Sequence, residues 1–566
     1  MLDTLVAVPL PPDDLGAEWW REGVLYQIYP RSFQDSNGDG IGDLKGIVSR
    51  LDYLKGRPDA LGIDGIWISP FYPSPMKDFG YDVSDYCDID PAFGTLEDFD
   101  ELVAEAHARG IRVIVDLVPN HTSDQHPWFV ESRSSRTNPK RDWYVWADPK
   151  PDGSPPNNWR SAFFRRQESA WTLDRTTGQY YLHSFLPEQP DLNWWNPAVR
   201  DAFDQILRFW LRRGVDGFRI DVAHKMARDP DLRDNPDYGI PLGEPLKSWP
   251  DDRRPYDEDW PEVHEIHRRF RRVIDEFDAR MLVGEVWVLD PRRMVEYYGT
   301  DGDELNLAFN FAFLRAPWSA EAFRDEVELF ESILPPGAWP DYTLSNHDNP
   351  RAVSRYAPDG DLVRGRQRAR LAALMLLTLR GTPFLYQGEE IGMADGPVPA
   401  DRLVDVAGRD PERTPMQWSA SADGGFTTGT PWLPVNPESA TVNVEAQRGD
   451  PRSLLELYRE VIRIRRASPA LRRGTFRTVP CTPAGVFAYV RELGDERWAI
   501  VLNFGDREMS IRLPGPADDG RLRLSTNPGR AVGGPIDSAV EIGVDEGLLI
   551  DLSGVGASDR PGAMPL

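Results

Sequence analysis

Short apolar segments alternate with amphipathic segments through most of the chain. The apolar segments are about four to eight residues long, rich in β-branched and aromatic residues and bounded by Gly, Pro, Asn or Asp, as is typical of buried strands. Eight strands are predicted, over residues 23–30, 62–69, 111–118, 214–221, 281–288, 303–310, 341–348 and 382–389. The segments between them, such as 96–110 and 199–214, carry apolar residues at helical spacing. This repetition predicts an α/β fold, a parallel (β/α)8 TIM barrel.

Two stretches depart from this alternation. The interval between the third and fourth strands is rich in Pro, Asn, Trp and Arg, and it is too long for a structureless loop in a compact domain. An inserted subdomain is therefore predicted over residues 119–190, with the barrel formed by 1–118 and 191–475. From 476 to 566 the chain changes to short alternating strands separated by turns. This change predicts a C-terminal antiparallel β domain.

Composition and charge narrow the classes of partner. The 566 residues include 65 basic and 91 acidic side chains, a formal net charge of −26 that disfavours nucleic acid and anionic membranes as partners. The longest apolar run, 371–379, is too short to cross a membrane, and no signal peptide is evident. With only Cys87 and Cys481, a disulfide framework is excluded. We expect a cytoplasmic monomer or homodimer that acts on small neutral molecules.

Charged and imidazole side chains stand at the carboxyl ends of several predicted strands. They are Asp116, Arg219, Asp221, Glu285, His347 and Asp348. The carboxyl ends of barrel strands meet at one rim, where barrel enzymes keep their active sites. Buried ion pairs that only hold the barrel together are the alternative, but each buried charge is costly to keep without a function. The pattern therefore favours an active site.

The types of residue at this rim fit one kind of chemistry. Arg219 is expected to depress the pKa of Asp221, two residues along the same strand face, which suits a nucleophile. Glu285 lies in an apolar segment, and burial there favours a protonated general acid. One ionised and one protonated carboxyl, about 5–5.5 Å apart, are what a retaining glycosidase uses. Asp348 and His347 are expected to bind sugar hydroxyls.

Four motifs carry a resemblance to a known family. They are "DLVPNH" (116–121), "GFRIDVAHK" (217–225), "GEVW" (284–287) and "LSNHDNPR" (344–351), and "QPDLN" (189–193) is a fifth. In this order they resemble the conserved regions of the α-amylase superfamily of glycoside hydrolases, in its oligo-1,6-glucosidase and α-glucosidase group. The resemblance covers the chain from about Trp19 onward.

The resemblance implies a role for each matching residue. Asp221 would be the nucleophile, Glu285 the general acid/base and Asp348 the stabiliser of the transition state. The implied contacts to the sugar are Asp82, His121, Arg219, His347 and Arg409, with Arg413 as a rival to Arg409. Aromatic residues such as Phe163, Phe164 and Trp195 are further candidates for the pocket wall.

The segment "DSNGDGIGD" matches part of a calcium-binding loop. Oxygen ligands would come from Asp35, Asn37, Asp39, the Ile41 carbonyl and Asp43, at positions one, three, five, seven and nine of an EF-hand pattern. The twelfth position is Gly46, where the pattern has a bidentate Glu. A structural calcium ion is predicted, with magnesium possible. The alternative is an Asp/Asn/Gly turn that binds no ion.

The reaction implied is removal of single α-glucosyl units from the non-reducing ends of short α-glucosides of the maltose or isomaltose type. Transglucosylation and sucrose or trehalose chemistry use the same site and stay open, although the Arg-Leu-Asp-Arg-Asp sequence of many sucrose isomerases is absent after Phe313. Val222, which follows the nucleophile, biases the linkage preference without deciding it. A non-catalytic carbohydrate-binding or interaction protein is the remote alternative.

Overall fold

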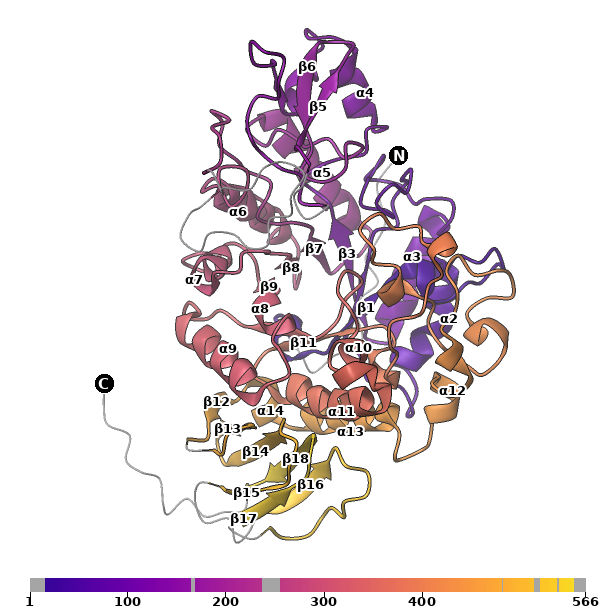
Figure 1. The fold of residues 1–566 in the computed structure, drawn as a ribbon, viewed down its shortest axis with the longest axis vertical. Coiled ribbons are helices and arrows are strands. Elements are labelled where there is room, and N and C mark those ends of the chain that lie inside the picture. Colours follow the sequence, from indigo (N-terminus) through magenta and orange to yellow (C-terminus); the bar gives the residue numbers. More distant parts are fainter. Residues whose placement is uncertain are drawn as a thin grey trace.

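The computed structural model describes residues 16–163, 168–236, 255–480, 482–513, 520–536 and 539–553. Eight parallel strands form a nearly closed barrel in the order β10-β11-β1-β2-β3-β7-β8-β9 (Figure 1). They are β1 (Leu25–Ile28), β2 (Gly65–Ile68), β3 (Arg112–Leu117), β7 (Gly217–Ile220), β8 (Met281–Gly284), β9 (Leu307–Ala308), β10 (Asp341–Thr343) and β11 (Thr382–Tyr386). Each lies within a predicted segment, so the predicted (β/α)8 barrel is confirmed.

Helices surround the barrel. The longer ones are α2 (Leu44–Leu54), α3 (Leu96–Ala108), α5 (Pro197–Arg212), α6 (Val263–Ile274), α9 (Ala320–Ile333), α11 (Leu362–Thr378) and α13 (Leu454–Ala467). The short ones are α1 (Trp19–Glu22), α7 (Pro291–Met294), α8 (Phe311–Leu314), α10 (Ala352–Arg355), α12 (Val444–Gln447) and α14 (Pro469–Arg473). Local sequence defines their starts: Thr95 and Asp98 form a capping box on α3, and Asn196 caps α5 ahead of Pro197.

The strand faces explain where the site forms. On β3, Ile114 packs in the apolar cluster inside the barrel, whereas Val113 and Val115 pack outward against the helices. Asp116 and Arg219 stand one step further along the inward faces of β3 and β7, towards the carboxyl ends. Successive side chains of a strand alternate between faces. The barrel interior is therefore apolar at its amino end and charged at its carboxyl end.

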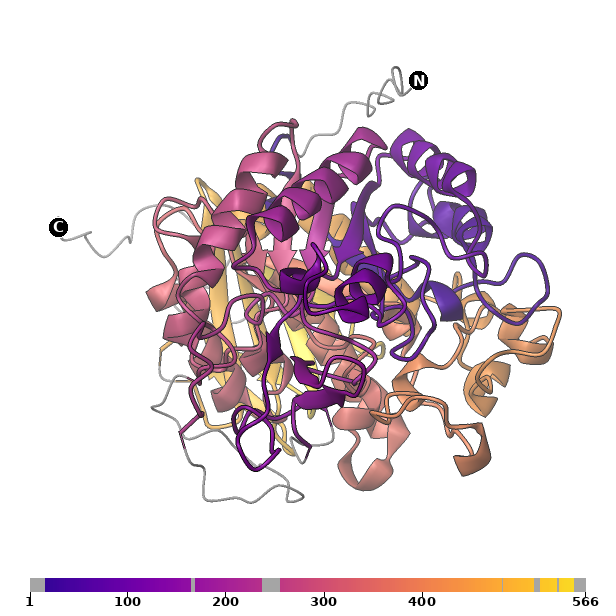
Figure 2. The same cartoon turned by 90° about the horizontal axis from the view of Figure 1, so that it is seen from above.

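The segment after β3 forms a small separate layer over the carboxyl end of the barrel. It contains α4 (Pro127–Ser134) and the antiparallel strands β4 (Trp146–Ala147), β5 (Trp171–Asp174) and β6 (Gln179–Leu182), in the order β4-β6-β5. These elements stand at the top of Figure 1 and lie in front of the barrel in Figure 2. A bridge between His121 and Asp191 joins the two ends of the segment. The insertion therefore covers the rim that carries the charged side chains.

The C-terminal region is antiparallel and lies at the opposite end of the molecule (Figure 1). Its strands are β12 (Thr475–Thr478), β13 (Val486–Leu493), β14 (Glu496–Asn503), β15 (Met509–Arg512), β16 (Arg521–Ser525), β17 (Ala539–Ile542) and β18 (Glu546–Asp551). Five form a sheet in the order β12-β13-β14-β18-β16, and β15 pairs with β17. Arg491 fastens the sheet to α11 by donating to the Thr378 carbonyl at 2.7 Å. Within the described ranges, no helix is long and apolar enough to cross a membrane.

Candidate active site

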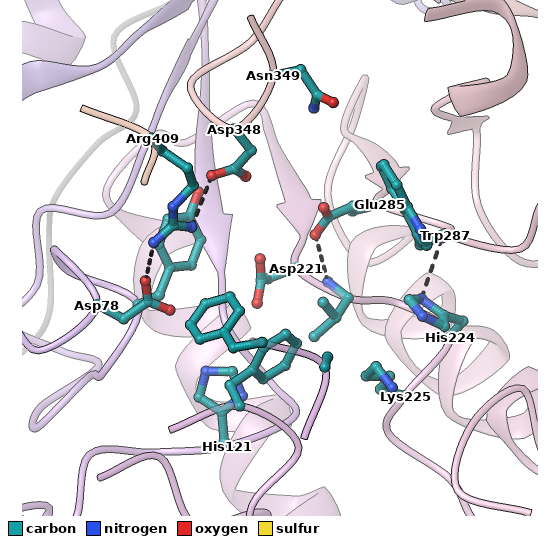
Figure 3. A pocket seen from close by; sticks show the side chains of 15 residues that line it. Asp78, His121, Asp221, His224, Lys225, Glu285, Trp287, Asp348, Asn349 and Arg409 are labelled. Carbon is teal, nitrogen blue, oxygen red and sulfur yellow. Dashed lines mark hydrogen bonds and ion pairs between the residues drawn. The ribbon is translucent and has the colours of Figure 1, made fainter. Parts of the chain in front are cut away.

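A cavity of about 420 Å³ opens at the carboxyl end of the barrel. It is lined by Asp78, Tyr81, His121, Ala162, Phe163, Phe185, Asp221, Val222, His224, Lys225, Glu285, Trp287, Asp348, Asn349 and Arg409. The three carboxylates predicted to be catalytic follow three different strands, β7, β8 and β10. In Figure 3, Asp221 lies between Asp348 on one side and Glu285 on the other. The structure thus brings the three carboxylates into one pocket.

Arg219 lies beneath the cavity and holds three carboxyl groups. Its NH1 atom is 2.6 Å from an oxygen of Asp221 and 2.7 Å from one of Asp116, and NH2 is 2.7 Å from Glu285. Trp67 lies against the guanidinium group and donates its indole N–H to Asp116. Arg219 does not line the cavity. Its contacts show that it orients the carboxyl groups from behind.

The pKa of Asp221 corrects the expectation from the sequence. Burial raises this pKa most, Arg219 lowers it, and the nearby carboxyl groups of Glu285 and Asp116 raise it, so the net direction is upward. Burial likewise raises the pKa of Asp116 to about 6. The prediction of a depressed pKa considered Arg219 alone and is wrong, because burial and the carboxyl groups that share this guanidinium outweigh its effect. Among the groups named, Arg219 alone favours the ionised form of Asp221 that a nucleophile needs.

The backbone at Val222, the residue after the nucleophile, is strained, and this strained turn helps to position Glu285. Val222 has φ = +36°, a left-handed conformation that costs a β-branched residue about 1–3 kcal/mol. This turn directs the Val222 N–H at Oε2 of Glu285, 3.0 Å away. Arg219 binds the same oxygen. Among the described residues both contacts use Oε2, so Oε1 is left to face a substrate.

Asp348 is held ionised by two arginines. Burial alone would raise its pKa, but His347, Arg409 and Arg413 lower it. Arg409 NH1 lies 3.0 Å and Arg413 NH2 2.8 Å from the same oxygen of Asp348. Burial lowers the pKa of His347 to about 3, so its imidazole is neutral and the arginines supply the charge at neutral pH. His347 is fully buried and stacks on Tyr81, beneath the cavity wall.

The two candidate arginines have different positions. Arg409 lines the cavity and bridges Asp348 to Asp78, whose oxygen lies 2.5 Å from NH2 (Figure 3). Arg413 is fully buried behind it and donates to the His347 carbonyl at 2.7 Å. Arg409 is therefore the arginine in position to meet a substrate, and Arg413 supports Asp348 from behind.

Asp82 does not lie where the sequence predicted. Its side chain is fully buried and accepts hydrogen bonds from the Ser74 hydroxyl at 2.9 Å and the Lys77 and Asp78 N–H groups at 2.9 and 3.0 Å. The carboxylate in the cavity is Asp78, four residues earlier in the same run. We therefore replace Asp82 by Asp78 as the candidate sugar-binding residue. Asp82 shapes the turn that presents it.

Replacing Asp82 by Ala is expected to weaken substrate binding without removing a group that touches substrate. The turn contains two non-glycine residues in left-handed conformations, Met76 (φ = 60°) and Phe79 (φ = 47°), and Asp82 bonds to the backbone between them. Loss of these bonds should raise KM about tenfold or more and change kcat less. Steady-state kinetics would measure this, with exposed Asp85→Ala as the control. A fall in kcat at unchanged KM would contradict the positioning role.

The other cavity residues include several that the sequence patterns did not single out. His121 lines the cavity as predicted, and burial lowers its pKa, so it is a neutral hydrogen-bonding group. Phe163 also lines the cavity, over Arg409. Trp195 does not, since its indole N–H donates to the Arg228 carbonyl, and Phe164 lies outside the described residues. Tyr81, Phe185, Trp287, Lys225 and Asn349 were missed. Trp287, Lys225 and Asn349 lie within the quoted motifs, and that membership was their signal in the sequence.

The candidate calcium loop forms a tight turn whose oxygens already accept hydrogen bonds. Both carboxylate oxygens of Asp35 accept backbone N–H groups, and Asn37 and Asp39 accept from N–H groups two residues ahead. Asp43 caps α2 through the Gly46 N–H at 2.7 Å. Within the described ranges, no group of three or more His, Cys, Asp or Glu side chains is placed to hold a metal ion. Calcium or magnesium binding at Asp35, Asn37, Asp39, Ile41 and Asp43 stays a prediction.

If the loop binds calcium, chelation should lower thermal stability more than it lowers activity, because the loop lies outside the catalytic cavity. Burial alone would raise the pKa of Asp35, but hydrogen bonds from Thr427, Gly38 and Gly40 lower it, so the loop keeps an anionic oxygen donor at neutral pH. We expect a fall in Tm of about 1–3 °C in a chelator, reversed by added calcium. An unchanged Tm would show that the turn folds without an ion.

The comparisons with known proteins agree with this site. The family model for the α-amylase catalytic domain matches residues 27–474. A probable alpha-glucosidase of Rhizobium meliloti is 48% identical over 529 residues, covering 89% of this chain and 92% of the relative. An oligo-1,6-glucosidase of Parageobacillus thermoglucosidasius is 41% identical, covering 88% and 92%. The crystal structure of the alpha-glucosyl transfer enzyme XgtA superposes with a TM-score of 0.85 at 38% identity, covering 94% of this chain and 99% of that one.

The barrel with its three rim carboxylates, together with the matching family model, shows that this chain belongs to the α-amylase family. It is an enzyme, a glycoside hydrolase. Within the family it falls in the oligo-1,6-glucosidase and α-glucosidase group.

Proposed function

We propose that this enzyme is a retaining, exo-acting α-glucosidase that releases α-glucose from the non-reducing ends of short α-glucosides. The observation that carries the retaining mechanism is the position of Arg219. Its two terminal nitrogens bind Asp221 at 2.6 Å and Glu285 at 2.7 Å, so one planar guanidinium keeps the two carboxyl groups close together. A close pair, about 5–5.5 Å apart, suits double displacement, whereas inverting enzymes leave about 6.5–9.5 Å for a water molecule.

In the first step, the Asp221 carboxylate attacks the anomeric carbon and forms a glucosyl ester. The bond to the leaving oxygen breaks as Glu285 transfers its proton to that oxygen. In the second step, Glu285 as a carboxylate removes a proton from water, which attacks the same carbon and frees Asp221. Asp348 would bind sugar hydroxyls as the ring distorts. Two inversions give glucose with its original α configuration.

The ion pair between Asp78 and Arg409 supports exo-action. It lies on the wall of the cavity away from Glu285 in Figure 3, and its polar atoms suit the terminal hydroxyls of one sugar ring. A pocket closed in this way fits a single non-reducing end better than the middle of a chain. The neutral His121 would add a hydrogen bond to the same ring. A cytoplasmic location, suggested by the small number of cysteines, belongs to the same proposal.

Proton NMR of fresh enzyme with maltose, isomaltose and maltopentaose tests the proposal. The expected first product is α-glucose, seen before mutarotation, with one glucose released at a time. Initial β-glucose would overturn the retaining mechanism, and release of maltose from maltopentaose before maltotetraose accumulates would overturn the removal of single glucose units. The relative rates on maltose and isomaltose would establish the linkage preference.

Transglucosylation is the second candidate. The similarity to the alpha-glucosyl transfer enzyme XgtA favours it, because the glucosyl ester can be attacked by a sugar in place of water. New anomeric signals from larger sugars in the same NMR experiment would make transfer the main reaction. Sucrose isomerisation is a weaker alternative, since residues 314–318 read "LRAPW" after Phe313.

A further inference from the structure

A second cavity, of about 740 Å³, lies between the connection from α2 to β2 and helix α13. In a parallel barrel, the connections from helices back to strands lie at the amino ends of the strands. This cavity therefore opens at the end of the barrel opposite the catalytic carboxylates. The proposed glucosidase mechanism makes no use of it.

The charge of the lining is opposite to that of the whole protein. Six basic side chains line the cavity: Lys55, Arg57, Arg448, Arg459, Arg463 and Arg466. Among the described residues that line it, three are acidic, whereas the chain as a whole has 65 basic and 91 acidic side chains. A general acidic surface for solubility does not account for such a local reversal. A concave basic surface concentrates small anions.

Three of these guanidinium groups share one carboxylate. Asp59 lies 3.5 Å from Arg448, 3.8 Å from Arg459 and 3.9 Å from Arg57. Charge-assisted hydrogen bonds are shorter, about 2.7–2.9 Å. Asp59 therefore offsets part of the charge, but it leaves most of the N–H groups of these arginines available.

Of the three arginines, Arg459 has the most buried side chain. Its side chain is only 11% exposed, and NH1 donates to Glu456 at 2.5 Å. Its Nε and NH2 atoms are buried and, among the described residues, have no hydrogen-bond partner. Buried donors without an acceptor are costly, and an oxyanion in the cavity would supply one.

The remaining basic residues of the lining are already paired. Arg463 forms two hydrogen bonds of 2.7 Å with Glu460, and Lys55 binds Asp64 at 2.9 Å and the Gly110 carbonyl at 2.8 Å. Arg466 pairs with Asp64 and donates to the Gly62 carbonyl at 3.0 Å. The unused donors are therefore concentrated around Asp59, at Arg57, Arg448 and Arg459. This concentration defines one end of the cavity as the place where an anion would bind.

We propose that this cavity binds the phosphoryl group of a small phosphorylated molecule on Arg57, Arg448 and Arg459. Guanidinium groups match the oxygens of phosphate in pairs, and an anion offsets the excess positive charge that three arginines leave beside Asp59 and Glu456. The volume exceeds what a phosphoryl group alone needs, so a sugar or similar neutral group can be attached to it. Binding would join the α2–β2 connection to α13 and stabilise the enzyme.

Isothermal calorimetry and thermal unfolding of the full-length enzyme, with inorganic phosphate and glucose 1-phosphate at constant ionic strength, test the proposal. We expect saturable binding with a Kd of about 0.1–1 mM and a rise in Tm. Tighter binding of glucose 1-phosphate would identify an organic phosphate as the ligand, and equal binding would identify free phosphate. No saturable binding of either probe would overturn the proposal.

Substitutions of single arginines test where in the cavity phosphate binds. Arg459→Gln and the more exposed Arg448→Gln should each weaken the binding of inorganic phosphate about tenfold and leave the turnover of maltose unchanged. Arg463→Gln is the matched control, since its side chain is 68% exposed and paired with Glu460. An equal loss of affinity in the control would show non-specific attraction. Unchanged affinity in Arg448→Gln would overturn the assigned position even if Arg459→Gln fails to fold.

Discussion

The Asp221→Ala variant is expected to lose turnover of maltose by a factor of at least about 10⁴, the scale typical of removing a catalytic nucleophile. Without this carboxylate no glucosyl ester forms, and water alone attacks the anomeric carbon poorly. The small side chain also leaves a space on the β face of the sugar. Added azide should enter that space, restore part of the activity and produce β-glucosyl azide, with inverted configuration. Kinetics with and without azide, and NMR of the product, measure both results.

The fold should survive this change. Arg219 keeps Asp116 at 2.7 Å and Glu285 at 2.7 Å, so its charge stays paired when Asp221 is removed. An unchanged circular dichroism spectrum and a similar Tm would check this. Asp201→Ala on α5 is the control, because its carboxylate is 71% exposed and does not line the cavity. Wild-type rates in Asp221→Ala, or an α-configured azide product, would contradict the assignment of the nucleophile.

The barrel could be predicted because its strands are buried on both faces and therefore appear as near-continuous apolar runs. The residues at which the strands begin and end were predicted less well. The segment 303–310 reads as one strand, but β9 contains only Leu307–Ala308, because pairing with β8 extends no further. Hydrophobic pattern detects burial, whereas strand ends depend on hydrogen bonds to a neighbour that is distant in sequence.

The inward charges could be predicted from strand geometry. Asp116 and Arg219 lie on inward faces of adjacent strands, and the period of two places Asp221 beside Arg219. The net pKa of Asp221 could not be predicted in this way. Burial raises this pKa most, and the carboxyl groups that share Arg219 raise it further; both are known only once β3, β7 and β8 are placed side by side.

Loop residues were the least predictable part of the site. Asp78 and Asp82 belong to one short run, and only the path of the turn decides which carboxylate points into the cavity. Left-handed backbone at Met76 and Phe79 breaks any regular alternation of side chains through this turn. Arg409 and Arg413 posed the same problem, four residues apart on a loop, and burial separated them. Side-chain direction on loops comes from tertiary contacts, which sequence periodicity does not encode.

The Glu285→Gln variant is expected to lose about 10²–10⁴-fold in the hydrolysis of maltose, because an amide cannot protonate the leaving sugar oxygen. The loss in the first step should depend on the leaving group. With 2,4-dinitrophenyl α-glucoside, whose leaving group needs no proton, a rapid burst of dinitrophenol should precede a slow steady state. The slow phase reflects the second step, in which Glu285 is needed as a base. Azide needs no base, so it should accelerate that phase and produce α-glucosyl azide.

The geometry of Glu285 makes this variant a clean test. Val222 N–H and Arg219 NH2 both bind Oε2, at 3.0 and 2.7 Å, so the single carbonyl oxygen of Gln can accept both and keep the side chain in place. Glu265→Gln on α6, 61% exposed, is the matched control. An equal loss on maltose and on the dinitrophenyl glucoside, with no burst, would contradict the role of Glu285 as acid. Azide should give α-glucosyl azide with Glu285→Gln and β-glucosyl azide with Asp221→Ala. The configuration of glucosyl azide therefore distinguishes the acid/base from the nucleophile.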